Sequence, residues 1–324
     1  MSILDGKHVL VTGGTGSFGK NFIKRVLDTT SAKRVVVFSR DELKQSEIAE
    51  HYQGESRLRF FIGDVRDYSR LLRAFDGVDI VIHAAALKQV PAVEYNPIEA
   101  VRTNINGAEN VINAALDRGV QRVIALSTDK ASSPINLYGA TKLVSDKLFV
   151  HGNAYVGGNP TRFSVVRYGN VVGSRGSVVP LFKRLAATGE IPITDDRMTR
   201  FLITLPQGVQ FVLDSLERMR GGEIFVPKIP SMKMVDLAQV IAPEAKIRIV
   251  GIRPGEKLHE EMISVNDARR SVDMGDHYVI KPEADWWASR DIGGVPLPEG
   301  FSYTSDRNAQ WLGTEELAHM VADA

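Results

Sequence analysis

A tyrosine and a lysine four residues apart are the pair of side chains in this sequence best suited to proton transfer. Tyr138 and Lys142 lie in the string YGATK, and two residues at this spacing share one face of a helix. A tyrosine with an ordinary pKa of about 10 is a poor base at neutral pH, but a neighbouring cation stabilises its phenolate form. Lowering that pKa to about 7 requires about 4 kcal/mol of differential interaction. The pair is therefore a candidate tyrosine base supported by a lysine.

A glycine-rich string near the start of the chain has the pattern of a phosphate-binding loop. Residues 11–19 read VTGGTGSFG, with a glycine at every third position from residue 13. Glycines permit a tight turn and let backbone N–H groups approach a pyrophosphate at the N-terminus of the following helix. The string follows an apolar run and precedes a helical pattern, which predicts dinucleotide binding. The residues expected to bind the cofactor here are Thr12, Gly13, Thr15, Gly16, Ser17, Phe18 and Gly19.

The residues after the second apolar run indicate which dinucleotide binds. An NAD site has a carboxylate here for the ribose hydroxyls, whereas an NADP site has a cation for the 2′-phosphate. Ser39 and Arg40 suit the phosphate, and Lys44 lies one helical turn beyond Arg40. Asp41 suits NAD instead, unless its carboxylate caps the helix that follows. The sequence therefore favours NADP.

These side chains need a scaffold, and the apolar pattern predicts one. Short apolar runs rich in β-branched residues predict buried parallel strands at residues 8–12, 34–38, 58–62, 78–82, 122–126 and 163–167. Helical periodicity predicts helices at residues 18–27, 42–51, 69–75, 97–117 and 138–149. Alternating strands and helices indicate an α/β fold with a Rossmann-type doubly wound parallel sheet. The tyrosine then follows the fifth strand, whose carboxyl end faces the nicotinamide in such a sheet.

The same scaffold places two further features. Asp64 and Val65 follow the third strand, where this fold usually contacts the adenine ring, although a strand-end turn explains them equally well. From about Val172 the alternation weakens, and glycine- and proline-rich joints interrupt shorter elements. We therefore expect an NADP-binding Rossmann domain with the catalytic residues at 1–170. A smaller, less regular and mainly substrate-binding part is expected at 171–324. Elements of this part and of the Rossmann domain are allowed to interleave.

Charge and cysteine content narrow the class of protein. The 324 residues carry 40 Lys+Arg and 39 Asp+Glu, a net charge of +1, which argues against binding nucleic acid through its phosphates. The absence of cysteine excludes disulfides and thiol nucleophiles and fits a reducing cytoplasm. No apolar run approaches the roughly 20 residues of a membrane helix, and the first residues lack the pattern of a signal peptide. We expect a cytoplasmic protein that binds neither nucleic acid nor a membrane.

Histidine and carboxylate spacing gives no sign of a metal. No set of His, Asp and Glu has the spacing of a convincing metal site. His83 ends an apolar run, so it is expected to be a hydrogen-bonded core residue rather than a catalyst.

Several strings together resemble the extended short-chain dehydrogenase/reductases. They are the glycine string, HAAA at 83–86, the tyrosine–lysine pair, and RPGEK at 253–257. More detailed strings resemble the inverting UDP-N-acetylglucosamine 4,6-dehydratases, and the likeness extends from about Leu4 to Trp311. These strings are STDKA at 127–131, PINLY at 134–138, LKQVP at 87–91, RYGNVVGSRGSV at 167–178 and MTRF at 198–201. The resemblance implies a hydro-lyase that converts UDP-N-acetylglucosamine to a UDP-4-keto-6-deoxy-hexosamine with inversion at carbon 5.

The loop before the tyrosine carries the residues that this resemblance assigns to elimination. Sugar-nucleotide dehydratases have an Asp–Glu pair there and epimerases do not, whereas this chain has Asp129 and Lys130. A carboxylic acid beside an amine supplies an acid for a leaving hydroxyl and a base for the adjacent proton. A surface ion pair is the alternative interpretation. Desolvation would lower the pKa of Lys130 and an ionised Asp129 would raise it, so the sign of the net shift stays open.

The resemblance implies a cycle in three stages. Tyr138, aided by Lys142, takes the proton of the 4-hydroxyl while hydride passes from carbon 4 to NADP⁺. The ketone acidifies carbon 5, so Lys130 removes that proton and Asp129 assists the loss of the 6-hydroxyl as water. Hydride returns to carbon 6, and carbon 5 is reprotonated from the opposite face. No external reductant is needed because the cofactor is regenerated.

The resemblance also implies binding residues. Ala84, Ala86 and Lys88 follow the fourth strand, where the lysine reaches the nicotinamide ribose or the sugar, unless it is a solvated side chain. An arginine is the expected diphosphate partner because its planar fork binds phosphate oxygens in pairs. The implied substrate-binding residues are Lys88, Lys130, Asn170, Arg175, Val178, Thr194 and Arg253, any of which has a structural role as its alternative.

Three other functions remain as alternatives: a retaining UDP-sugar 4,6-dehydratase, a UDP-sugar 4-epimerase, and a non-catalytic NADP-binding protein. The Asp129–Lys130 pair argues against the epimerase, because epimerisation at carbon 4 needs no eliminating acid. The tyrosine–lysine pair argues against a non-catalytic protein. The resemblance further suggests pseudaminic acid biosynthesis for flagellin glycosylation, and homo-oligomers that are dimers or hexamers.

Overall fold

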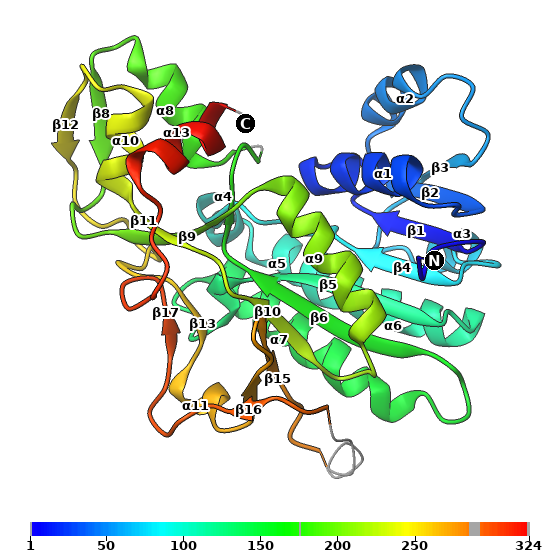
Figure 1. The fold of residues 1–324 in the computed structure, drawn as a ribbon. Helices are drawn as coiled ribbons and strands as arrows, with labels where there is room; N and C mark the ends of the chain where they lie inside the picture. Colours follow the sequence, from blue (N-terminus) through cyan, green and yellow to red (C-terminus); the bar gives the residue numbers. More distant parts are fainter. Residues whose placement is uncertain (1, 175, 285–291, 323–324) are drawn as a thin grey trace.

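The computed structural model describes residues 2–174, 176–284 and 292–322 (Figure 1). All six predicted strands form, with ends within two residues of those expected. They are β1 (His8–Thr12), β2 (Arg34–Ser39), β3 (Leu58–Ile62), β4 (Ile80–His83), β5 (Arg122–Thr128) and β6 (Arg162–Tyr168). They lie parallel in the order β3-β2-β1-β4-β5-β6. This is the order of a doubly wound dinucleotide-binding sheet, which confirms the predicted fold class.

The inner strands are apolar because both of their faces are covered. Leu10 lies opposite Val36 on β2 and Val81 on β4, and all three side chains are buried. Helices α1 (Ser17–Thr29) and α9 (Leu205–Arg218) pack together over one face. On the other face lie α3 (Tyr68–Ala74), α6 (Gly107–Arg118) and α7 (Leu137–Gly152), which Figure 1 shows beyond the sheet from α9.

One predicted helix differs from expectation. The stretch 97–117 forms α5 (Pro97–Ala100), a π-helical segment η1 (Val101–Asn106) and then α6. The buried Asn104 in η1 donates to the carbonyl oxygen of Leu87 at 2.9 Å and accepts from the Leu87 N–H at 2.8 Å. A wider helical turn that places a side chain against a neighbouring loop is common near functional sites. Helical periodicity alone does not distinguish such a turn from an ordinary α-helix.

The large sheet continues beyond residue 170. β10 (Ile224–Pro227) pairs parallel with β6, and β15 (His277–Ile280), β14 (Ser271–Asp273) and β16 (Val295–Pro296) extend it antiparallel to ten strands. The boundary at residue 170 remains a prediction, and strands from both sides of it share one sheet.

A second, smaller core lies beyond the carboxyl ends of the parallel strands, at the upper left of Figure 1. It contains α8 (Val178–Ala186), β8 (Glu190–Ile193), α10 (Met234–Ile241), β12 (Lys246–Ile249) and α13 (Thr314–Ala322). The remaining elements are α2 (Glu42–His51), α4 (Val90–Tyr95), η2 (Asp129–Ala131), η3 (Asn153–Tyr155), β7 (Asn170–Val171), β9 (Thr199–Ile203), β11 (Ser231–Lys233), β13 (Glu261–Ile263), α11 (Val265–Ala268) and β17 (Tyr303–Thr304). No helix within the described ranges is long and apolar enough to cross a membrane.

Candidate active site

A cavity of about 750 Å³ opens at the carboxyl ends of the parallel strands and brings most of the predicted site residues together. Its wall includes Gly13, Thr15, Gly16, Ser17, Phe18, Gly19, Ser39, Arg40, Asp41, Lys44, Asp64, Val65, Ala84, Ala86, Lys88, Lys130, Tyr138, Lys142, Asn170 and Val178. Four other predicted residues, Thr12, Asp129, Thr194 and Arg253, do not line it. Arg175 lies outside the described residues.

The glycine loop forms the middle of the cavity wall, because β1 lies between β2 and β4, and it has no room for a side chain at Gly13 or Gly19. A Cβ atom on Gly13, where φ is 65°, would lie 2.9 Å from the Ala85 nitrogen. A Cβ atom on Gly19 would collide with the Gly14 carbonyl oxygen, so α1 approaches the loop as closely as backbone allows. The loop leads into the N-terminus of α1 at Ser17, where the positive end of the helix dipole favours an anion. This cradle fits the pyrophosphate of a dinucleotide.

Thr12 supports the loop from beneath. Its buried hydroxyl contacts the Nδ1 atom of His83 at 2.9 Å and accepts from the Ala84 N–H at 3.2 Å. Burial and the nearby Lys142 charge lower the pKa of His83 to about 3, so its ring is neutral. The prediction that His83 is a hydrogen-bonded core residue is confirmed.

The residues expected near the adenosine lie at the end of the cavity beside β2 and β3. Asp41 caps α2, because its carboxylate accepts from the Lys44 N–H at 3.0 Å and also contacts the Lys44 ammonium. The Arg40 side chain is 56% exposed, and its Nη1 atom lies 3.5 Å from the Asp64 carboxylate. The capping role expected for Asp41 as the alternative to NAD binding is therefore confirmed.

Tyr138 and Lys142 project from the first turns of α7 into the cavity, as their spacing predicts. The helix begins at Leu137 because Asn136 caps it, accepting from the Gly139 N–H at 2.8 Å. Burial raises the pKa of Tyr138 to about 12, although the Lys130 charge opposes it. Burial also lowers the pKa of Lys142. Both shifts favour the uncharged forms until a charge arrives in the cavity.

Gly139 brings the elimination pair next to the tyrosine. A Cβ atom at this position would collide with the carbonyl oxygen of Lys130, so a glycine lets η2 pack directly on α7. The Thr128 hydroxyl donates to Asp129 Oδ1 at 2.9 Å at the start of η2. Lys130 lies on the cavity wall, and Asp129 lies behind it with 1% of its side chain exposed.

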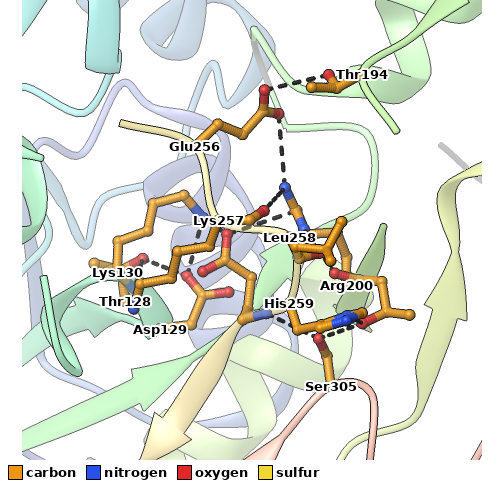
Figure 2. A network of polar contacts seen from close by, with 12 residues as sticks. Thr128, Asp129, Lys130, Thr194, Arg200, Glu256, Lys257, Leu258, His259 and Ser305 are labelled. Carbon is orange, nitrogen blue, oxygen red and sulfur yellow. Dashed lines mark hydrogen bonds and ion pairs between the residues drawn. The ribbon is translucent and has the colours of Figure 1, made fainter. Parts of the chain in front are cut away.

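Lys130 lies between the two buried carboxylates of Asp129 and Glu260. Its Nζ atom donates to Asp129 Oδ1 at 3.1 Å, and Figure 2 shows these two side chains close together. Nζ also donates to Glu260 Oε1 at 3.0 Å. Burial opposes the charged form of Lys130, but the two carboxylates outweigh burial and raise its pKa above the ordinary value. Burial raises the pKa of Asp129, although the Lys130 charge opposes that rise. The sign that sequence left open is therefore positive for Lys130, which is an ammonium in this structure.

Arg200 on β9 organises the chain segment that carries Glu260. Its guanidinium donates to the carbonyl oxygens of Lys257 and Leu258, both at 3.0 Å, and lies 3.6 Å from Glu256 (Figure 2). The Thr194 hydroxyl donates to Glu256 at 3.2 Å, so Thr194 belongs to this network rather than to the cavity wall. Arg253 is exposed in the loop just before it.

Sequence reasoning missed the roles of Asn104, Thr128, Gly139, Arg200 and Glu260. Arg200 and Thr128 stood inside strings that resemble the dehydratases, so the motif carried a signal for both. Glu260 comes 130 residues after Lys130, and no local pattern connects them. In the described part of the chain, no group of three or more His, Asp or Glu residues could hold a metal ion.

Known proteins with similar sequences include dehydratases and epimerases. Residues 9–282 match the family described as polysaccharide biosynthesis protein. The chain is 54% identical over 330 residues to UDP-N-acetylglucosamine 4,6-dehydratase (inverting) of Campylobacter jejuni subsp. jejuni serotype O:23/36 (strain 81-176), with 98% of each covered. It is 43% identical over 282 residues to UDP-glucose 4-epimerase of Rickettsia canadensis (strain McKiel), covering 85% of this chain and 82% of that protein.

A solved structure extends the likeness to the whole fold. The X-ray structure of Pen from Bacillus thuringiensis superimposes with a TM-score of 0.91 at 36% identity, covering 100% of this chain and 99% of that one.

Proposed function

Since the chain belongs to the polysaccharide biosynthesis protein family, we propose that it is a hydro-lyase that dehydrates UDP-N-acetylglucosamine with inversion at carbon 5. One observation carries the proposal: Lys130 and Tyr138 line the same cavity, and Asp129 lies behind Lys130 and is hydrogen-bonded to it. Elimination of water needs such an acid and base in addition to the tyrosine. The 54% identity to an enzyme of that name supports the same conclusion.

We infer that the dinucleotide is NADP. The glycine loop and the start of α1 fit its pyrophosphate, and Ser39 and Arg40 lie where the 2′-phosphate would bind. Asp41 is engaged in capping α2, which leaves Arg40 as the charged group at this position most suited to a phosphate. When bound, the nicotinamide accepts hydride from carbon 4 of the sugar and returns it to carbon 6.

The protein's part in the first stage falls to Tyr138. The Lys142 ammonium, four residues along the same helix face, stabilises the Tyr138 phenolate, which takes the proton of the 4-hydroxyl and becomes a phenol. Asp146, one further turn along α7, favours the charged form of Lys142 against the effect of burial.

In the elimination stage Lys130 and Asp129 exchange a proton first. Lys130 is an ammonium, so it passes a proton to Asp129 across their 3.1 Å hydrogen bond and becomes a neutral amine. The amine takes the carbon 5 proton, and the electrons of that C–H bond form the carbon 5–carbon 6 double bond as the carbon 6–oxygen bond breaks. Lys130, which lines the cavity, gives a proton to the departing oxygen, which leaves as water, and Asp129 returns its proton to Lys130 across their hydrogen bond. Both side chains end as they began.

The substrate groups that we assign to the remaining residues follow from their positions. Lys88, Asn170 and Val178 line the cavity and are placed to contact the nicotinamide ribose, the sugar or the uridine diphosphate. Thr194 and Arg253 lie outside the cavity wall, so their contact with the substrate stays a prediction from the resemblance. Arg175 remains a predicted diphosphate partner.

Mass spectrometry of the purified protein with UDP-N-acetylglucosamine, NADP⁺ and no reductant tests this function. A product lighter by one water is expected. An isomer of unchanged mass would instead identify a 4-epimerase, the activity named for the Rickettsia relative. A cytoplasmic location, dimeric or hexameric assembly, and a place in pseudaminic acid biosynthesis for flagellin glycosylation stay predictions.

A further inference from the structure

Glu260 is a buried carboxylate that belongs to none of the sequence motifs quoted above. It immediately precedes β13, only 2% of its side chain is exposed, and its Oε1 atom lies 3.0 Å from Lys130 Nζ. The same oxygen lies 3.6 Å from Arg200 Nε. Its second oxygen, Oε2, has no hydrogen-bond partner among the described residues. The Lys130 and Arg200 cations therefore compensate the buried charge of Glu260.

We propose that Glu260 is a positioning residue for the elimination: its carboxylate holds the Lys130 amine in one orientation against Asp129 and supplies a lasting negative charge behind it. This inference rests on the proposed function.

The orientation follows from the number of donors on a lysine. An ammonium has three N–H bonds. Asp129 and Glu260 accept two of them, at 3.1 and 3.0 Å. The third position on the nitrogen is left for the cavity that Lys130 lines. Once a proton has passed to Asp129, a turn about the Cε–Nζ bond brings the lone pair of the amine to this third position, where it meets carbon 5, and one N–H is still donated to Glu260. Without Glu260, the flexible lysine stem has only one anchor at its tip.

The backbone holds Glu260 in place independently of its charge. Its N–H donates to the Ser305 hydroxyl at 2.9 Å, and its carbonyl oxygen accepts from the Ser305 N–H at 2.8 Å. The Ser305 hydroxyl also contacts the Thr199 hydroxyl at 2.7 Å, next to Arg200. A substitution that keeps the size of the side chain therefore leaves the local fold intact.

The charges around Lys130 shift the pKa values of the two carboxylates in opposite directions. Burial opposes ionisation of Glu260, but Lys130 and Arg200 outweigh it and lower its pKa. For Asp129, burial and the Glu260 charge outweigh the Lys130 charge and raise the pKa. Glu260 thus stays ionised, and Asp129 is the member that takes and releases the proton. The charged or titratable groups near Lys130 are Asp129 from η2, Tyr138 from α7, Arg200 from β9, and Lys257 and Glu260 from the segment before β13.

The test measures the rate of dehydration against pH in wild type and three variants. Glu260→Gln keeps the shape and one acceptor oxygen but removes the charge. Its profile should move to lower pH by about one unit on both limbs, because Asp129 and Lys130 then release protons more readily. Its maximal kcat should fall about tenfold with KM unchanged, because a weaker acceptor orients the amine less well.

Glu260→Asp separates charge from position. It keeps the charge on a shorter stem, so its pH profile should stay in place while kcat falls. Glu261→Gln is the matched control: this neighbouring carboxylate accepts from the Ser132 and Ser133 hydroxyls at 2.7 Å, not from Lys130, and the variant should resemble wild type. A Glu260→Gln variant with the wild-type profile and kcat would overturn the inference. Wild type that releases no water would overturn the proposed function, and this inference with it.

Discussion

Tyr138 is, at the scale of single residues, the group on which the chemistry depends most strongly. With a pKa raised to about 12 by burial, its phenol would need roughly 7 kcal/mol of stabilisation to ionise near pH 7. The sequence predicted the tyrosine and its lysine partner. The free-energy cost of ionising the tyrosine was predicted to be smaller, because that prediction started from the ordinary tyrosine pKa of about 10. The positive charges of Lys142 and of a bound nicotinamide must supply the difference.

Replacing Tyr138 by phenylalanine should therefore stop oxidation at carbon 4 and leave substrate binding largely intact. Loss of a general base costs about 10²–10⁴-fold in rate. Stopped-flow absorbance of NADPH should rise in wild type, faster at higher pH as the phenol ionises, and show no such pH-dependent rise in the variant. Tyr155→Phe, on an exposed tyrosine of η3, is the control. NADPH formation at the wild-type rate in Tyr138→Phe would reassign the base.

Arg40 decides cofactor choice at the same scale. Arg40→Ala should weaken NADP binding about tenfold, because a charge-assisted contact to the 2′-phosphate is lost, and leave NAD binding unchanged. Titration of both cofactors measures this, with Arg34→Ala at the opposite end of β2 as the control. Tighter binding of NAD than of NADP to the wild type, with no effect of Arg40→Ala, would contradict the assignment.

At the scale of elements, the sequence predicted best those strands and loops whose pattern lies within a few consecutive residues. The six strands and the glycine loop follow from apolar runs and glycine spacing, which act over a few residues. The π-helical turn η1 did not, because it depends on Asn104 bonding across to Leu87. The close packing of η2 on α7 was also hidden, since the need for Gly139 appears only when Lys130 is placed beside it.

The glycine loop gives the element-scale prediction. Gly19→Ala should weaken NADP binding by about tenfold or more, because the added methyl group pushes α1 away from Gly14 and widens the cradle. Isothermal titration measures the change. Gly208→Ala is a matched control inside α9, where a Cβ atom meets nothing within 4 Å, and should stabilise the fold by up to about 1 kcal/mol. Equal NADP affinity in Gly19→Ala and wild type would show that the loop does not hold the cofactor.

At the scale of the whole molecule, the catalytic group is assembled from distant parts of the chain. Lys130 belongs to the Rossmann half, whereas Arg200 and Glu260 come from the later half, which also adds four strands to the large sheet. The sequence indicated that this half is irregular but not how it folds, because strands as short as β7 and β11 are too brief to show a period. Their places are set by pairing with β9.

The central claim is that the reaction eliminates water with inversion at carbon 5. Turnover in heavy water tests this outcome directly. UDP-N-acetylglucosamine is converted without added reductant, and NMR reads the configuration and deuterium content of carbon 5. Wild type should give a 4-keto-6-deoxy sugar with deuterium at an inverted carbon 5. Lys130→Glu should still oxidise carbon 4 but lose most of that product. A wild-type product with retained configuration at carbon 5, or undiminished inverted and deuterated product from Lys130→Glu, would contradict the mechanism.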